Sequence, residues 1–141
     1  MITKHKQLSS GLEDYLETIY IAHMANKTLK GAELARQLNI SRASVSEALT
    51  KLVTKKLIKY DSYKDITLTK EGEMQALKIY RKHNALKKFF EEILGIEKKE
   101  AEENACRIEH IISQNVYNRI SDFTQFCKEN PQIIEKYKTK S

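Results

Sequence analysis

The chain has few of the residues that interrupt or cross-link a fold. Its 141 residues include one proline, four glycines and two cysteines. Two cysteines are too few for a disulfide framework, and no secretory segment opens the chain, so we expect a protein of the reducing cytoplasm. No apolar run approaches the roughly 20 residues that span a bilayer, so we expect no membrane contact. Long helices are expected to dominate such a chain.

The sequence also lacks the glycine-rich loops that cradle nucleotides, since neither G-x-x-x-x-G-K-[ST] nor G-x-G-x-x-G occurs. What it has instead is an excess of positive charge, +6 overall, with a pI of about 9.2. Residues 1–69 hold 11 lysines and arginines against 7 acidic residues, whereas residues 70–141 hold 14 against 12. A polyanionic partner is therefore favoured, and the first half is the better candidate to contact it.

Apolar spacing in the first half predicts three helices. Residues 11–25 and 29–38 repeat apolar side chains every three or four positions, and Ser41 is a good N-cap for a third helix over residues 41–56. The break at residues 39–41 separates two short helices. Two short helices around so short a turn are typical of a helix-turn-helix.

A short β-hairpin is expected directly after the third helix. Residues 57–60 and 65–69 alternate apolar and polar side chains, and Asp61, Ser62, Tyr63 and Lys64 form a polar tip between them. A hairpin in this position is the wing of a winged helix-turn-helix. The sequence thus predicts a mainly α chain with a small β-hairpin.

Helical spacing resumes in the second half. Thr69 caps an expected helix that Gly95 ends, a second helix covers about 97–113, and Ser121 begins a third through about Glu129. Pro131 is expected to end the regular structure. We place the domain boundary between residues 70 and 71, with the winged helix in 1–70 and a helical domain in 71–141.

The second helix of a helix-turn-helix enters the DNA major groove with its N-terminal residues nearest the bases. Arg42 suits guanine or a phosphate, Ala43 suits a thymine methyl, and Glu47 suits cytosine N4. Alternatively, these residues only cap a helix whose polar face is solvated. Helix-turn-helix folds also serve as protein-binding modules, which is a second alternative. The candidate DNA-binding residues are Ser41, Arg42, Ala43, Ser44, Ser46, Glu47, Thr50 and Lys51, with Lys64 in the hairpin.

A second constellation has the chemistry of a metal site. Cys106, Glu109 and His110 lie at i, i+3 and i+4, so they share a helical face. Thiolate, carboxylate and imidazole together suit a divalent transition metal of borderline softness. Asp14 and Glu17 form an acidic pair beside the apolar stripe of the first helix. A buried cysteine with ordinary surface residues would look the same, so spacing alone leaves both readings open.

Several segments together resemble the diphtheria-toxin-repressor and manganese-transport-regulator family. They run from about Leu8 to Phe126 in the order GLEDYLETIY, ISRASVSEALTKL, LIKYDSYKDITLTKEG, RKH and ACRIEHIIS. The resemblance implies a homodimeric repressor of metal homeostasis, not an enzyme, that binds double-stranded operator DNA when Mn²⁺ or Fe²⁺ is plentiful. It also implies that the helical domain of residues 71–141 binds metal and dimerises.

The resemblance further implies which residues hold metal. Asp14 and Glu17 match the acidic pair of manganese-type members, whereas Cys106 matches the cysteine of iron-type members. The remaining ligands that the resemblance implies are His83, Glu109 and His110.

Two residues depart from the iron-type pattern, because Lys87 replaces a glutamate and Glu102 replaces a histidine. We therefore expect one site from Asp14, Cys106, Glu109 and His110, with Glu17 and His83 available to a neighbouring ion. The chain is also too short for the SH3-like domain of iron-type members, which favours manganese slightly.

Two other functions are compatible with the residues alone. A metal-independent winged-helix regulator would respond to a small ligand or a partner protein. A metalloenzyme would activate water at an open Cys/Glu/His site, but the sequence offers no additional base beside one and no substrate-binding glycine loop.

Overall fold

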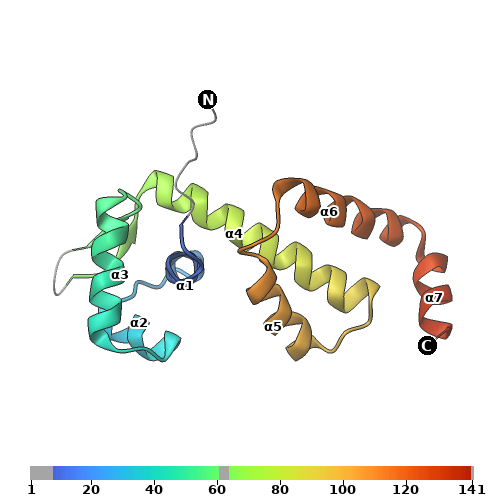
Figure 1. The fold of residues 1–141 in the computed structure, drawn as a ribbon, viewed down its shortest axis with the longest axis horizontal. Coiled ribbons are helices and arrows are strands. Elements are labelled where there is room, and N and C mark those ends of the chain that lie inside the picture. Colours follow the sequence, from blue (N-terminus) through green and yellow to red (C-terminus); the bar gives the residue numbers. More distant parts are fainter. Residues whose placement is uncertain (1–7, 61–63, 141) are drawn as a thin grey trace. The chain divides into compact units, whose positions relative to one another are not determined.

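A computed structural model describes residues 8–60 and 64–140. The chain divides into two compact units, Met1–Lys78 and Ile79–Ser141, and the division falls inside one long helix (Figure 1). Helices predominate and one two-stranded hairpin accompanies them, which confirms the predicted fold class. In chain order the elements are α1 (Ser10–Met24), α2 (Gly31–Leu38), α3 (Arg42–Thr54), β1 (Ile58–Lys59), β2 (Thr67–Leu68), α4 (Lys70–Lys88), the π-helix η1 (Phe89–Ile93), α5 (Lys98–Ile108), α6 (Gln114–Glu129) and α7 (Pro131–Thr139).

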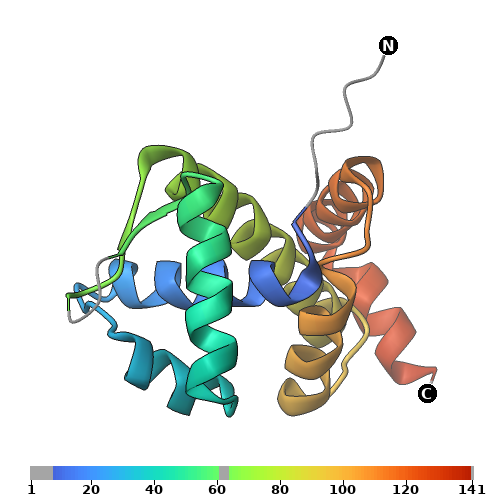
Figure 2. The same ribbon diagram turned by 60° about the vertical axis from the view of Figure 1, so that its left-hand side comes forward.

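The first unit is built around three helices and the hairpin. Figure 2 shows α3 crossing α1, and both helices contact α2 and a strand of the hairpin. Each fully buried leucine removed from water contributes about 1.5–3 kcal/mol, so this core accounts for most of the unit's cohesion. Its buried side chains include Ile19, Leu34, Val45, Leu49, Leu52 and Leu57.

The turn between α2 and α3 has the expected helix-turn-helix form. Asn39 ends α2 in the left-handed region at φ 54°, which asparagine tolerates better than most residues. Ser41 then caps α3, because its side-chain oxygen accepts a hydrogen bond of 3.1 Å from the backbone N–H of Ser44. These two residues fix where one helix stops and the next begins.

The expected wing is present as an antiparallel pair. Ile58 lies opposite Leu68 and Lys59 opposite Thr67, while Leu29 adds a bridge to Ile66. The predicted tip residues Asp61, Ser62 and Tyr63 lie outside the described residues. The hairpin therefore joins the end of α3 to the start of α4.

Three expectations for the second unit were wrong. The helix expected over about 97–113 ends at Ile108. The helix expected to start at Ser121 begins a full two turns earlier, because Ser113 caps it by accepting from the backbone N–H of Val116. Pro131, expected to end the regular structure, instead begins α7 at its first helical position. Proline is well suited to that position, since its missing N–H would have had no partner within the helix.

The second unit also contains a π-helical turn that the sequence did not predict. Helix α4 continues into η1, where the backbone N–H of Leu94 donates to the carbonyl of Phe89, five residues back. Gly95 follows at φ 71° and ends the helix, as expected. Both α5 and α6 contact η1, so this turn lies at the centre of the unit.

Within the described ranges, no helix combines the length and the apolarity that crossing a bilayer requires.

Candidate metal centre and candidate nucleic-acid interface

Helix α5 carries two small buried residues directly before the polar residues that contact α4. Ala101 and Ala105, one turn apart, have no exposed surface. The residue that follows each alanine contacts His83 of α4. Glu102 and Cys106 occupy those following positions, and Glu109 comes one turn later.

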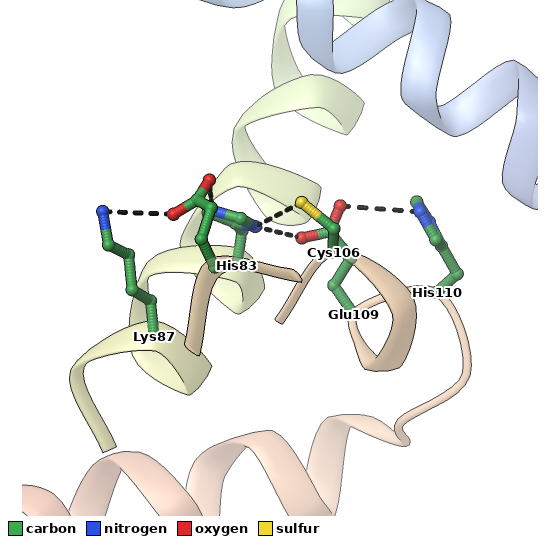
Figure 3. Close-up of polar contacts among 6 residues, drawn as sticks. His83, Lys87, Cys106, Glu109 and His110 are labelled. Carbon is green, nitrogen blue, oxygen red and sulfur yellow. Dashed lines mark hydrogen bonds and ion pairs between the residues drawn. The ribbon is translucent and has the colours of Figure 1, made fainter. Parts of the chain in front are cut away.

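His83 on α4 lies at the centre of the resulting cluster (Figure 3). Its Nδ1 lies 2.6 Å from Oε2 of Glu109, and its Nε2 lies 2.9 Å from Oε1 of Glu102. Both ring nitrogens therefore face a carboxylate, which is the arrangement of a doubly donating imidazolium. The His83 side chain is only 8% exposed, and that of Glu109 is completely buried.

This environment raises the pKa of His83 above its ordinary value of 6.5. The hydrogen bond with Glu109 is the largest cause; burial acts in the opposite direction, and the charges of Glu109 and Glu102 add to the increase. His83 therefore holds its proton more tightly than a free imidazole does, and it would have to release that proton to bind a metal.

Lys87, one turn after His83 on α4, contacts the other oxygen of Glu102. Its Nζ lies 3.1 Å from Oε2 of Glu102, and this interaction raises the pKa of Lys87. Burial acts to raise the pKa of Glu102, yet the lysine and the His83 charge hold it below its usual range. Glu102 is thus an ionised carboxylate shared between two cationic side chains.

Cys106 and His110 complete the cluster on its other side (Figure 3). Sγ of Cys106 lies 3.8 Å from Nδ1 of His83, and Nε2 of His110 lies 3.5 Å from Oε1 of Glu109. That Glu109 oxygen is buried, and no hydrogen bond from the described part of the chain reaches it. A buried carboxylate oxygen without a hydrogen-bond donor is costly unless a cation approaches it.

The donor set fits a divalent transition metal. One ligand atom each from His83, Glu102 and Cys106 lie within 4.8 Å of one another. Thiolate, imidazole and carboxylate are all ligands that iron, manganese and zinc accept. The under-bonded oxygen of Glu109 is a further ligand atom in the same cluster.

The structure therefore brings together four of the six predicted metal ligands, His83, Cys106, Glu109 and His110, within the second unit. Asp14 and Glu17 lie one turn apart on α1 in the first unit, so their part in the site stays a prediction. Sequence reasoning missed Glu102 as a cluster member and treated it only as a departure from a pattern. Its position four residues before Cys106 was the signal that placed it on the same helical face.

Helix α3 exposes the predicted DNA-binding residues on one face. Its other face, formed by Val45, Ala48, Leu49 and Leu52, is buried in the core of the first unit. The residues that the structure leaves exposed to solvent are Ser41, Arg42, Ala43, Ser44, Ser46, Glu47, Thr50 and Lys51, and also Lys64 beyond the strand β1. Apart from Lys64, these residues lie at the N-cap and in the first three turns of α3.

Two charged residues on this face interact with each other. Nζ of Lys51 lies 3.5 Å from Oε1 of Glu47, one turn before it. The side chains are 58% and 72% exposed, so the pair is readily rearranged when a ligand approaches.

Comparison with known families assigns a description to each half. Residues 7–66 match the family model of the iron-dependent repressor N-terminal DNA-binding domain. Residues 69–138 match that of the iron-dependent repressor metal-binding and dimerisation domain.

Individual relatives agree with these matches. An uncharacterised HTH-type transcriptional regulator of Methanocaldococcus jannaschii is 38% identical over 123 residues, which cover 86% of this chain and 98% of the relative. The HTH-type transcriptional regulator MntR of Lysinibacillus sphaericus is 31% identical over 126 residues and 89% of each chain.

Two longer solved structures have a similar fold. The manganese regulator SloR has a TM-score of 0.73 and 30% identity, over 82% of this chain and 54% of that one. A manganese-dependent transcriptional repressor in complex with manganese has a TM-score of 0.75 and 28% identity, over 82% of this chain and 53% of the other. The chain thus spans about half the length of these two structures.

Proposed function

Because the chain belongs to the iron-dependent repressor family, we propose that it is a transcriptional repressor of metal-ion homeostasis that Mn²⁺ or Fe²⁺ activates for operator binding. The observation that carries the proposal is the cluster of His83, Cys106, Glu109 and His110 inside the half that matches a metal-binding domain. The protein acts as a homodimer on double-stranded DNA in the cytoplasm, and it is not an enzyme.

The proposed metal site combines residues of both units. Cys106, Glu109 and His110 provide ligands from the second unit, and Asp14 provides one from α1. Glu17 and His83 lie beside this set in the family pattern and are available to a neighbouring ion. The thiolate of Cys106 favours Fe²⁺, while the added carboxylates favour Mn²⁺.

The switch follows from the charges of these residues. Without a cation, Asp14, Glu17 and Glu109 repel one another, and the two units gain nothing from approaching. When bound, the ion supplies the positive charge that these carboxylates share. An arrangement in which ligands of both units meet at the ion would bind it more tightly than one in which they are apart. Metal would therefore shift the population towards the first arrangement. In a homodimer, that arrangement holds the two α3 helices one turn of DNA apart, about 34–36 Å.

The polar face of α3 reads the operator in this proposal. Arg42, at the start of the helix, is placed to pair with guanine or to hold a phosphate, and Glu47 to accept from cytosine N4. Ala43 offers a methyl contact to thymine. The remaining proposed contacts are made by Ser41, Ser44, Ser46, Thr50, Lys51 and Lys64, which position the protein on the backbone.

The proposal is tested by operator binding under anaerobic conditions. An operator is selected from a random double-stranded library in the presence of Mn²⁺, and binding is then titrated with Mn²⁺, Fe²⁺ and Zn²⁺ or measured with a chelator. We expect binding that Mn²⁺ or Fe²⁺ strengthens and that the chelator abolishes. Equal binding with and without the chelator would select the metal-independent regulator instead.

Two cysteine variants form a matched pair for the same assay. Cys106→Ala removes a proposed ligand, and we expect it to abolish the metal response while the protein stays folded. Cys127→Ala changes the second cysteine, which is buried on α6 and is not a proposed ligand, and we expect the response to persist. A normal metal response in Cys106→Ala would refute the assigned site.

A further inference from the structure

The polar cluster of the second unit already contains a cation of its own. Nζ of Lys87 lies 3.1 Å from Oε2 of Glu102, and the Lys87 side chain is only 28% exposed. Figure 3 shows Lys87 and His83 reaching into the cluster from the same helix. Lys87 therefore brings a fixed positive charge to the edge of the group His83, Glu102 and Cys106.

That charge changes what the group is able to bind. His83, Glu102 and Cys106 have the donor types and the spacing of a small metal site. However, Oε1 of Glu102 faces His83 at 2.9 Å, and Oε2 faces Lys87. A divalent ion bound through Glu102 has to take one of these oxygens from its cationic partner, and it then lies close to an ammonium of the same sign. Like charges at such a distance disfavour each other strongly in a partly buried site.

We infer that Lys87 serves as a built-in cation that keeps a second divalent ion out of the group His83, Glu102 and Cys106. The neighbouring ion for which His83 was available is excluded as well, because Glu109 and Glu102 occupy both of its ring nitrogens. Each protomer therefore binds a single activating ion. Lys87 also holds Glu102, and Glu102 in turn holds the Nε2 side of His83, which orients the ring whose Nδ1 faces Glu109. Lys87 thus has two roles: it positions residues of the proposed metal centre, and it excludes a second divalent ion. This inference rests on the proposed function, because it concerns how many ions activate the repressor.

The inference is tested by counting bound ions. Wild type, Lys87→Glu and the control Lys88→Glu are dialysed anaerobically against Mn²⁺, and the metal per protomer is measured by elemental analysis. Lys88 is the next residue of α4 and is exposed, so its variant makes the same charge change outside the cluster. We expect about one ion in wild type and in Lys88→Glu, and about two in Lys87→Glu, where the ammonium is replaced by a carboxylate.

Unfolding temperature in a chelator gives a second readout. In Lys87→Glu the new carboxylate faces Glu102, so we expect the metal-free variant to melt below wild type and Mn²⁺ to raise its melting temperature more than that of wild type. If Lys87→Glu does not fold, Lys87→Met keeps the aliphatic stem and removes the charge. We then expect a second Mn²⁺ to bind at least about tenfold more tightly than any second ion in wild type.

Two results would overturn the inference: two ions in wild type, or a single ion in folded Lys87→Glu with Lys87→Met equal to wild type. A wild type that binds no ion would instead overturn the proposed function. If wild type binds no ion, one ion in Lys87→Glu still supports the role of Lys87. If neither Lys87→Glu nor Lys87→Met binds an ion, the role of Lys87 and the proposed function are both refuted.

Discussion

At the scale of single residues, the proposed metal centre depends on how His83 is held. Glu109 and Glu102 face its two ring nitrogens at 2.6 and 2.9 Å, and both carboxylates come from or directly follow α5. The ring is therefore fixed in orientation before any metal binds. The same two contacts favour its protonated form, so a proton would compete with a metal ion for the residue.

The first prediction concerns the pH dependence of the metal-free protein. The folded-state pKa of His83 lies above its unfolded value of 6.5, so its contribution to stability is fully present below pH 6.5. That contribution is lost as the pH rises through the raised folded pKa. We expect the free energy of unfolding in urea with chelator to fall over this range in wild type. The fall is expected to be smaller in His83→Gln, and an unchanged slope in this variant would contradict the assigned contacts.

The second prediction concerns the buried carboxylate. Glu109→Gln keeps the shape of the side chain but removes the charge from an oxygen that lacks a hydrogen-bond donor. We expect Mn²⁺ affinity, measured by competition with a fluorescent chelator, to fall at least about tenfold. Glu103→Gln changes an exposed glutamate on the same helix and is expected to leave the affinity unchanged. Equal affinities in both variants would remove Glu109 from the site.

Only part of this cluster was predictable from the sequence. The i, i+3, i+4 spacing of Cys106, Glu109 and His110 indicated a common face, because helical geometry is local. The pairing of His83 with Glu102 was not predictable from spacing, because 19 residues separate them and only the packing of α5 on α4 brings them together. The role of Lys87 depends on that same packing.

At the scale of elements, the start of α4 is fixed by a close approach of two backbones. A Cβ on Gly72 would lie 1.8 Å from the carbonyl oxygen of Leu57, so only glycine fits there. Thr69 strengthens the same junction, since its N–H donates to Leu57 and its hydroxyl donates to the carbonyl of Lys56 at 2.7 Å. These contacts tie the first turn of α4 to the hairpin.

The third prediction follows from that approach. We expect Gly72→Ala to lower the free energy of unfolding by about 1–3 kcal/mol, since the added methyl forces backbone away from backbone. Gly11→Ala is the matched control, because a Cβ at this position in α1 meets nothing within 4 Å. There we expect unchanged or slightly greater stability, since alanine favours helix. Equal stabilities in urea titrations would contradict the account of the junction.

The fourth prediction concerns the exposed face of α3. We expect Arg42→Ala to weaken binding to the selected operator by about 1–3 kcal/mol and to weaken binding to unrelated DNA less. Arg119→Ala removes an exposed arginine from α6 and is expected to change neither affinity. Fluorescence anisotropy at a fixed salt concentration measures both. Equal losses on the two DNAs in Arg42→Ala would make Arg42 a phosphate contact.

Elements with strong local signals were predicted, and each element that was missed or misplaced has an identifiable cause. Helix α1, the helix-turn-helix and the hairpin all have clear periodicity or caps, and each was confirmed. The start of α6 was misplaced because Ser113 was not recognised as a cap. Helix α7 was missed because Pro131 was taken as a terminator instead of a first helical residue. The π-turn at η1 depends on packing within the second unit and leaves no periodic signal.

At the scale of the whole molecule, the proposed regulation depends on a link between the two units. The residues proposed to read DNA lie in the first unit, and four of the six proposed metal ligands lie in the second. Asp14 and Glu17 are the proposed ligands on the DNA-binding side. Metal responsiveness therefore requires that a ligand from α1 joins the cluster around Glu109 when the ion binds.

The most direct measurement is a crystal structure of the full chain with Mn²⁺, with anomalous scattering recorded above and below the manganese edge. We predict one manganese peak per protomer, bound by the carboxylate of Asp14 together with Cys106, Glu109 and His110. A manganese peak bound only by residues of the second unit, with Asp14 remote from it, would contradict the proposed link between metal and DNA binding.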